Sequence, residues 1–155
     1  MNVPAECFQP QDPGFAARVR ASFSRQRAMQ LIGAALTTVE AGCCEIELPW
    51  REDLTQQKGY VHGGIIGMIA DSACGYAAYS LMPASASLVT VEYKINITAP
   101  ARQGLLVARG EVVKLGRTLS ITNGEVYLRH EGRSVLVAAL QQTLMMLPDT
   151  PDTPE

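Results

Sequence analysis

The stretch that decides the fold is GYVHGGIIGMIADSACGYAAYSLM, residues 59–82. After its paired glycines, nearly every residue is apolar or small, over a length that allows several helical turns. A helix that is apolar nearly all round must be covered on nearly all sides. One carboxylate, Asp71, stands in the middle of this run. The sequence therefore predicts a central helix whose single ionisable group requires an explanation of its own.

Composition is typical of one compact domain. The chain has 155 residues, of which 47% are hydrophobic, and this suffices for a core of its own. The net charge of −2 gives no indication of a nucleic acid or an acidic membrane surface as a partner. The N-terminus lacks the basic and apolar regions of a signal peptide. The apolar run 65–82 carries Asp71, several small polar residues and no basic flanks, so we expect a buried helix and no membrane span.

The four cysteines are Cys7, Cys43, Cys44 and Cys74. They form no CxxC pair and have no metal-ligand spacing, so no metal site is expected. Reduced thiols in a cytoplasmic protein are the expectation.

The segments around the central helix have different periodicities. Asp12 followed by Pro13 predicts a helix start, and apolar residues four apart continue an amphipathic helix to Gly33. Residues 38–50 alternate with a period of two and predict one strand, and the polar residues 51–61 predict a loop. One face of that strand is expected to carry Cys44, Ile46, Leu48 and Trp50.

Four further strands are predicted after the central helix, which we expect to end near Pro83. They span residues 89–98, 105–113, 119–128 and 134–147. In the first of them Val89, Val91, Tyr93, Ile95 and Ile97 are expected to share a half-buried face. The predicted fold is therefore α+β, a curved antiparallel sheet wrapped around the long apolar helix, with an extra N-terminal helix.

The predicted organisation is an N-terminal extension (residues 1–34), one folded domain (35–147) and a tail (148–155). The tail is proline-rich and acidic, and disorder is expected there. No repeat or linker divides the chain.

His62, Gly63 and Gly64 stand where the loop meets the central helix. Glycines here leave the first helical N–H groups open to a ligand, at the positive end of the helix dipole. Such groups can stabilise a carbonyl oxygen that becomes an oxyanion in acyl transfer. The alternative is steric relief alone.

Asp71 admits several interpretations. It faces solvent on a partly exposed helix, it is buried and satisfied by a hydroxyl such as that of Ser72, or it lies at the rim of an apolar cleft. In the last position the carboxylate is available as a base or nucleophile. Gly63 and Asp71 are eight residues apart, which is roughly 12 Å along one helix. If both act on one carbonyl, each site takes its glycine from one chain and its aspartate from another, which predicts a homodimer.

Residues 59–78 resemble the signature helix of the hotdog-fold thioesterases, especially the phenylacetic-acid-degradation (PaaI-type) acyl-CoA thioesterases. The resemblance rests on the HGG motif and on the acidic residue nine positions after its histidine. SLVTVEYKINITAPARQG (residues 87–104) and the Gly116-Arg117 turn extend it, so that it covers roughly residues 35–147.

This resemblance implies hydrolysis of an acyl-CoA to a carboxylic acid and CoA, without metal or redox cofactor. By position, Asp71 is the nucleophile or the general base for water, and the Gly63 N–H polarises the carbonyl. The assisting side-chain amide is Gln56, or Gln57 if the loop register differs. His62 orders the loop or contacts the thioester, and a histidine satisfied by backbone groups is the equal alternative.

The remaining residues include the candidates for substrate binding. Gly64 belongs to the open helix start, and Thr90 either holds the water or nucleophile or is an ordinary strand threonine. Cys74 is expected to be a small core residue. The candidate cations for the phosphates of CoA are Arg102, Lys114 and Arg117.

Two other functions stay open on this sequence, a non-catalytic acyl-CoA binder and a hotdog hydratase or dehydratase. The acyl group, aromatic or medium-chain aliphatic, and the choice between dimer and tetramer are also open.

Overall fold

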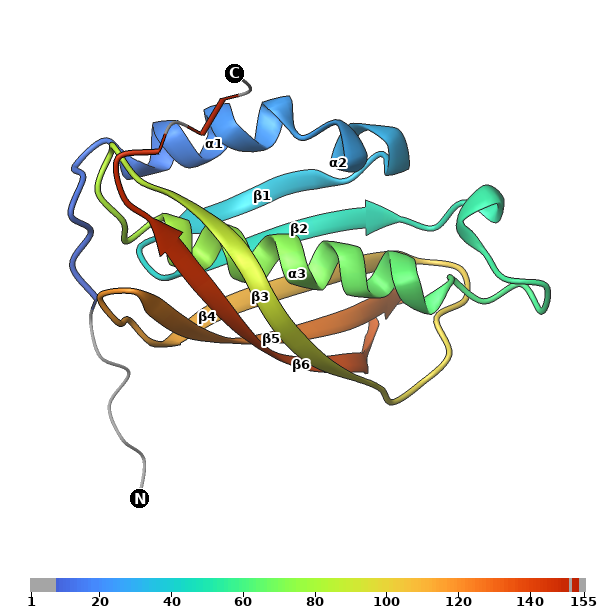
Figure 1. The fold of residues 1–155 in the computed structure, drawn as a ribbon. Coiled ribbons are helices and arrows are strands. Elements are labelled where there is room, and N and C mark those ends of the chain that lie inside the picture. The colour runs from blue at the N-terminus through green and yellow to red at the C-terminus, as the bar shows by residue number, and fades with distance from the viewer. Residues whose placement is uncertain (1–7, 151, 154–155) are drawn as a thin grey trace.

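A curved sheet of six antiparallel strands encloses one long helix in the computed structural model, which describes residues 8–150 and 152–153 (Figure 1). The strands follow the order β1-β2-β4-β5-β6-β3 across the sheet. They are β1 (Ala35–Glu40), β2 (Cys43–Pro49), β3 (Ser87–Ile97), β4 (Leu105–Lys114), β5 (Leu119–His130) and β6 (Arg133–Leu147). The helices are α1 (Phe15–Arg25), α2 (Arg27–Ile32), the 3-10 helix η1 (Glu52–Leu54) and α3 (Gly63–Tyr79). The predicted α+β hotdog fold is confirmed.

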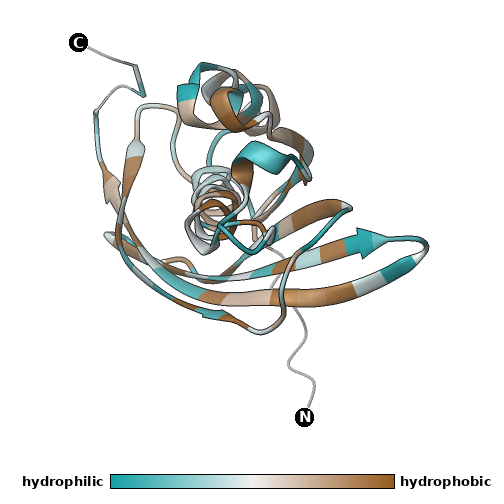
Figure 2. Cartoon of the chain, turned by 90° about the vertical axis from the view of Figure 1, so that its right-hand side faces the viewer, coloured by the Kyte–Doolittle hydropathy of each residue, from teal (hydrophilic) through white to brown (hydrophobic). Residues whose placement is uncertain are grey.

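The central helix α3 is buried because the sheet curls around it. Viewed along the helix, α1 and α2 lie on the side that the sheet leaves open (Figure 2). Gly110 of β4 permits close contact, because a Cβ there would lie 2.4 Å from the backbone nitrogen of Cys74. At Gly124 of β5 a Cβ would lie 2.8 Å from the Cys74 sulfur. The helix backbone therefore rests directly on the sheet, without intervening side chains at this point.

The N-terminal segment forms two helices, so the prediction of one continuous helix is wrong. The chain is extended at Gln26 (φ −76°, ψ 93°), and this ends α1 and begins α2. Asp12 accepts a hydrogen bond from the Gly14 N–H (2.8 Å), but the helix itself begins at Phe15. Its predicted end is confirmed, because Gly33 takes the left-handed conformation that stops α2.

The guanidinium of Arg18 ties α1 to the end of the central helix. It donates to the carbonyl oxygens of Tyr79 (3.2 Å) and Met82 (2.8 Å), and its Nε donates to Asp12 (2.8 Å). Positive charge is favourable beside carbonyl groups at the C-terminal end of a helix. This contact fixes α1 beside the C-terminal half of α3.

The predicted single strand 38–50 is a hairpin, β1 and β2, that turns at Gly42 (φ +79°). On β2 the predicted inward face is confirmed, because Cys44, Ile46 and Leu48 are fully buried. The prediction missed β1 because it is an edge strand with a register irregularity and no clean alternation of burial.

Strand β3 forms the other edge of the sheet, and its predicted half-buried face is wrong. A register irregularity between Thr90 and Glu92 changes which residues face inward. Thr90 therefore contacts α3 before the irregularity and Tyr93 contacts it afterwards. Val91 is 53% exposed and Ile97 is 48% exposed. One chain alone thus leaves an apolar edge strand uncovered.

The other predicted elements agree with the structure within a few residues. The strands β4, β5 and β6 are confirmed, α3 ends four residues before Pro83, and the loop 51–61 contains η1 and a bridge between Thr55 and Val61. In the predicted tail, Asp152 forms an ion pair with Arg25 (3.0 Å). Residues 151, 154 and 155 lie outside the described residues, as does Cys7. None of the described helices has the length and apolar character needed to cross a membrane.

Replacing Gly110 with alanine should lower the free energy of unfolding by about 3 kcal/mol, because the new methyl group displaces the helix backbone. Gly75→Ala is the matched control, since its Cβ would meet only Leu88, at 3.9 Å, and alanine favours a helix by about 0.5–1 kcal/mol. Urea unfolding of both variants measures the difference. Equal stability of the two variants would contradict the close contact.

Candidate active site

Asp71 lies on the side of α3 that faces the start of β3, and its side chain is half-buried. Its Oδ1 accepts hydrogen bonds from the Thr90 hydroxyl (2.8 Å) and from the side-chain amide of Gln142 (2.5 Å). The same amide nitrogen also donates to Thr90 (2.9 Å). Three elements, α3, β3 and β6, therefore hold one carboxylate oxygen. Among the described residues, no hydrogen bond reaches Oδ2.

The contribution of Gln142 was not predicted. Its side chain is fully buried on β6, where Leu140 and Leu144 occupy the neighbouring inward positions. The signal in the sequence is a glutamine at an inward position of an otherwise apolar strand. Its partner is 71 residues away along the chain, so spacing alone does not reveal the pair.

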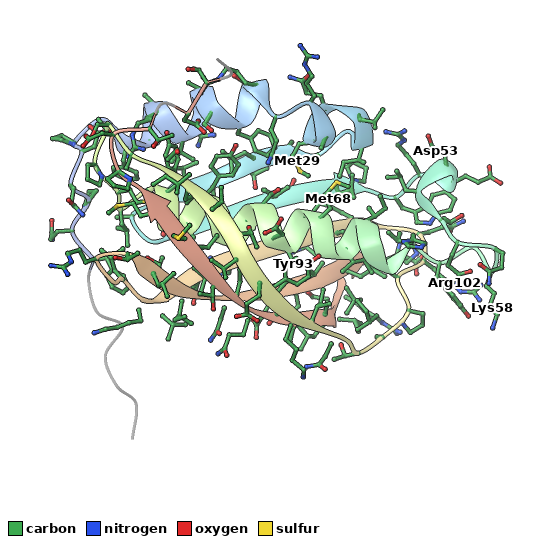
Figure 3. All side chains as sticks on the ribbon, viewed as in Figure 1. Met29, Asp53, Lys58, Met68, Tyr93 and Arg102 are labelled. Carbon is green, nitrogen blue, oxygen red and sulfur yellow. The ribbon has the colours of Figure 1, made fainter. Side chains whose placement is uncertain are left out.

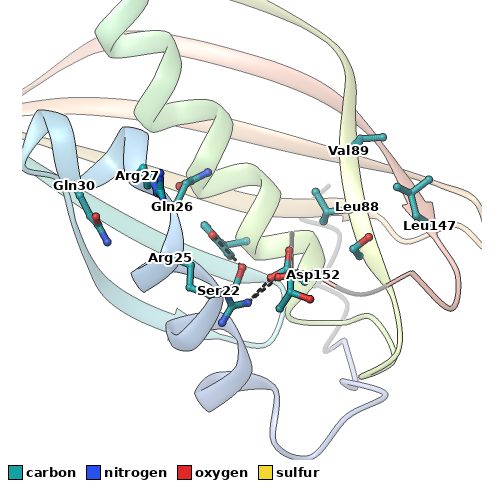
Figure 4. Close-up of a pocket in the computed structure, with 12 residues that line it drawn as sticks. Ser22, Arg25, Gln26, Arg27, Gln30, Leu88, Val89, Leu147 and Asp152 are labelled. Carbon is teal, nitrogen blue, oxygen red and sulfur yellow. Dashed lines mark hydrogen bonds and ion pairs between the residues drawn. The ribbon is translucent and has the colours of Figure 1, made fainter. Parts of the chain in front are cut away.

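A cleft of about 210 Å³ adjoins Asp71. It continues into a wider groove of about 660 Å³ between α1, α2 and the start of β3 (Figure 4). Both are lined by Ser22, Gln26, Tyr76, Leu88, Val89 and Asp152. The Tyr76 and Ser22 hydroxyl groups lie 3.2 Å apart, so the lining has polar groups as well as apolar ones.

The start of α3 is a separate site. His62 caps the helix, because its Nδ1 accepts a hydrogen bond from the Gly64 N–H (2.9 Å). An imidazole nitrogen accepts only when it carries no proton, so this contact requires the neutral ring with its proton on Nε2. The loop-ordering part of the prediction for His62 thus has a structural counterpart.

Gly63 borders a second pocket, of about 380 Å³, together with Gln56, Tyr60 and Ile97. A Cβ at Gly63 would meet no atom within 4 Å, so the helix start is open on this side. The Gln56 side-chain oxygen accepts a hydrogen bond from the Lys58 N–H, which leaves its NH₂ group for a ligand. Gln57 is exposed and does not line this pocket.

The structure keeps the two ends of the candidate site apart within one chain. Asp71 does not line the pocket of Gly63, and Gly63 does not line the cleft of Asp71. This agrees with the separation of roughly 12 Å expected along the helix.

The candidate cations are also divided between two regions. Arg102 stacks on the ring of Tyr60 (4.4 Å) and donates to its hydroxyl (2.8 Å), beside the start of α3 (Figure 3). This guanidinium lowers the pKa of Tyr60. Lys114 and Arg117 are exposed at the far end of β4, about 30 Å along the strand from its start near Arg102. One chain therefore does not bring all three together.

The described cysteines are free and buried. Burial raises the pKa of Cys43 to about 11 and the pKa values of Cys44 and Cys74 to about 12. A thiol must ionise to act as a nucleophile, so Cys74 is unsuited to that role although it lies near Asp71. Within residues 8–150 and 152–153, no group of three or more acidic, histidine or cysteine residues is arranged to bind a metal ion.

Comparisons with known proteins assign the family. The model of the Thioesterase superfamily matches residues 58–135. A thioesterase family protein from Silicibacter pomeroyi, known from a crystal structure, has 43% sequence identity to this chain. The alignment covers 87% of this chain and 99% of that protein's chain, with a TM-score of 0.85. The chain therefore belongs to the Thioesterase superfamily.

Two further proteins are similar. A 1,4-dihydroxy-2-naphthoyl-CoA hydrolase of Listeria monocytogenes is 26% identical over 92 residues, which are 59% of this chain and 75% of that one. The PaaI protein of the E. coli phenylacetic acid degradation operon is 18% identical, with a TM-score of 0.79 over 88% of this chain and 95% of its own, and shows the same fold. The predicted hotdog thioesterase membership is confirmed, and with it the enzyme class of thioester hydrolases.

The buried cysteines should resist alkylation in the native protein. Because burial raises their pKa values to about 11 or 12, almost no thiolate is present at pH 8. Treatment with iodoacetamide and peptide mass spectrometry should find Cys43, Cys44 and Cys74 unlabelled until urea unfolds the chain. Rapid labelling of Cys74 in the native state would contradict this assignment.

Proposed function

We propose that this protein is an acyl-CoA thioesterase that hydrolyses an acyl-CoA to a carboxylic acid and CoA. The observation that carries the proposal is the carboxylate of Asp71, held through Oδ1 by Thr90 and Gln142 at the edge of a cleft. A carboxylate fixed through one oxygen presents the other to a substrate or a water molecule. The name of the Listeria monocytogenes relative, a hydrolase of an aromatic acyl-CoA, supports this substrate class.

In the proposed reaction Asp71 acts either as general base or as nucleophile. As a base, it takes a proton from water, whose oxygen attacks the thioester carbonyl. As a nucleophile, it forms an anhydride that water then hydrolyses. In both cases the carbonyl oxygen gains negative charge, which the Gly63 N–H and the NH₂ of Gln56 would stabilise. The carbon–sulfur bond then breaks, in the nucleophilic route as the anhydride forms, and CoA leaves as a thiolate that takes up a proton released from water. Water is therefore the only co-reactant, and no metal or redox cofactor is required.

We further propose that the active enzyme is a homodimer whose two sites each combine residues of both subunits. The Asp71 cleft lies at the start of β3, at Leu88 and Val89, and the Gly63 pocket lies at its end, at Ile97. Antiparallel pairing of β3 with its copy, about a two-fold axis near Tyr93, places the start of one strand beside the end of the other. Asp71 then faces the partner subunit's Gly63.

The exposed residues of β3 support this arrangement. An unpaired edge strand with apolar side chains tends to pair with another chain, and Val89, Val91, Tyr93 and Ile97 are each more than 40% exposed. Pairing would cover them and complete the backbone hydrogen bonds of the edge. Association of two such dimers into a tetramer is compatible with the apolar residues left exposed on β4, β5 and β6, which are Val113, Leu119 and Val135.

The phosphates of CoA are assigned to exposed arginine and lysine side chains. Arg102, stacked on Tyr60 beside the Gly63 pocket, is the first candidate. Lys114 and Arg117 lie at and beyond the opposite end of β4, at the end of the sheet where Leu119 pairs with Met145 and Met145 with Val89. The three described cysteines are free thiols, which suits a reducing compartment such as the cytoplasm.

Asp71→Asn should lower kcat for acyl-CoA hydrolysis by about 10²- to 10⁴-fold, because the amide cannot act as a base or nucleophile. Thiol release from a panel of aromatic and medium-chain acyl-CoAs measures the loss. Undiminished hydrolysis by this variant would exclude the mechanism. A wild-type protein that binds acyl-CoA but releases no thiol would instead be a non-catalytic binder.

Two inactive variants should restore activity when they are mixed. A dimer of Gly63→Val and Asp71→Asn chains contains one site in which both groups are intact. After complete subunit exchange at equal amounts, about a quarter of the wild-type activity is expected, since half of the dimers are mixed and each has one working site. Exchange is verified by native mass spectrometry, and no recovery after verified exchange would exclude the shared site.

A further inference from the structure

We propose that Gln142 is a positioning residue that holds the carboxylate of Asp71 in its reactive orientation. The inference rests on the proposed thioesterase function. It adds a third residue to the part of the site around Asp71, where the sequence indicated Asp71 and Thr90. Gln142 lies at the centre of β6, is fully buried and does not line the cleft, so it acts through Asp71 and not on the substrate.

The hydrogen bonds among the three side chains form a closed ring. The Gln142 amide nitrogen lies 2.5 Å from Asp71 Oδ1 and 2.9 Å from Thr90 Oγ1, and the Thr90 hydroxyl donates to the same Oδ1. Oδ1 therefore accepts two hydrogen bonds. Rotation of the carboxylate would break both. Oδ2 is therefore the oxygen that the ring leaves for chemistry.

The chemistry of the partners fixes the orientation of the amide. An ionised carboxylate only accepts hydrogen bonds, so the glutamine must direct its nitrogen and not its oxygen toward Asp71. The reverse orientation would place two acceptors in contact. The assignment of donors and acceptors in the ring is therefore supported both by the chemistry of the groups and by the distances between them.

The buried amide of Gln142 lowers the stability of the fold although it holds Asp71 in place. Its Oε1 is buried and has no hydrogen-bond partner among the described residues. A buried polar atom without a partner is unfavourable, and an apolar side chain such as those of Leu140 and Leu144 would avoid it. The amide is therefore better explained by what it does to Asp71 than by a contribution to the core.

The deciding variant is Gln142→Met, which has a similar shape but no hydrogen-bond donor. We expect kcat for acyl-CoA hydrolysis to fall by about 10- to 100-fold, as for other groups that orient a reactive residue. KM should stay within about twofold, because Gln142 does not touch the substrate. The midpoint of thermal unfolding should be unchanged or higher, because the substitution removes the unpaired Oε1.

The neighbouring glutamine of the same strand provides the matched control. Gln141 is exposed and contacts Asn123 on the outer side of the sheet, so Gln141→Met should retain wild-type kcat, KM and thermal midpoint. A loss of kcat in Gln142→Met accompanied by a clear fall of the thermal midpoint would indicate a merely structural role and overturn the inference. Wild-type kcat in Gln142→Met would overturn it as well.

A second measurement tests the contact without any substrate. Urea unfolding of the wild type, Asp71→Asn, Gln142→Met and the double variant forms a double-mutant cycle. If Gln142 holds Asp71, the effects on the unfolding equilibrium constant should be non-additive by a factor of about 3 to 100. Additive effects would overturn the inference. If the wild type hydrolyses no thioester, the proposed function fails, and the cycle still decides whether Gln142 fixes Asp71.

Discussion

At Gly110 the backbone of α3 comes so close to β4 that a single methyl group would collide with the peptide unit between Ala73 and Cys74. This contact determines which side of the helix is covered by the sheet and which side is left for other contacts. Asp71, one turn earlier, lies on the side that faces the edge strand β3. A charged group is tolerated in this apolar helix because that side opens into a cleft and offers hydrogen-bond donors.

The edge strand β3 connects the chemistry with assembly. Its irregularity between Thr90 and Glu92 directs both Thr90 and Tyr93 toward α3, and the same strand leaves apolar side chains exposed along its free edge. The strand thereby holds the Asp71 carboxylate on one side and offers a surface for a second chain on the other. Catalysis and dimer formation, as proposed, therefore both involve β3.

The sequence predicts those features that depend on local patterns. The apolar run 65–82, the alternation in the last three strands and the turn glycines are such patterns, and they suffice for the architecture and for Asp71 as a candidate. The hairpin of β1 and β2 was missed because an edge strand lacks regular alternation. Gln142 was missed because its role depends on a contact with a residue 71 positions away, which only the folded sheet creates.

The cleft beside Asp71 has walls from distant parts of the chain. The matched family region, residues 58–135, supplies the carboxylate and the strand that faces it. The opposite wall comes from Ser22 and Gln26 at the end of α1 and from Asp152 near the C-terminus, all outside that region. The carboxylate and part of the cavity wall therefore come from segments far apart in the sequence. Substitutions at Ser22 or Gln26 would alter the cavity while leaving Asp71 and its hydrogen-bond partners Thr90 and Gln142 unchanged.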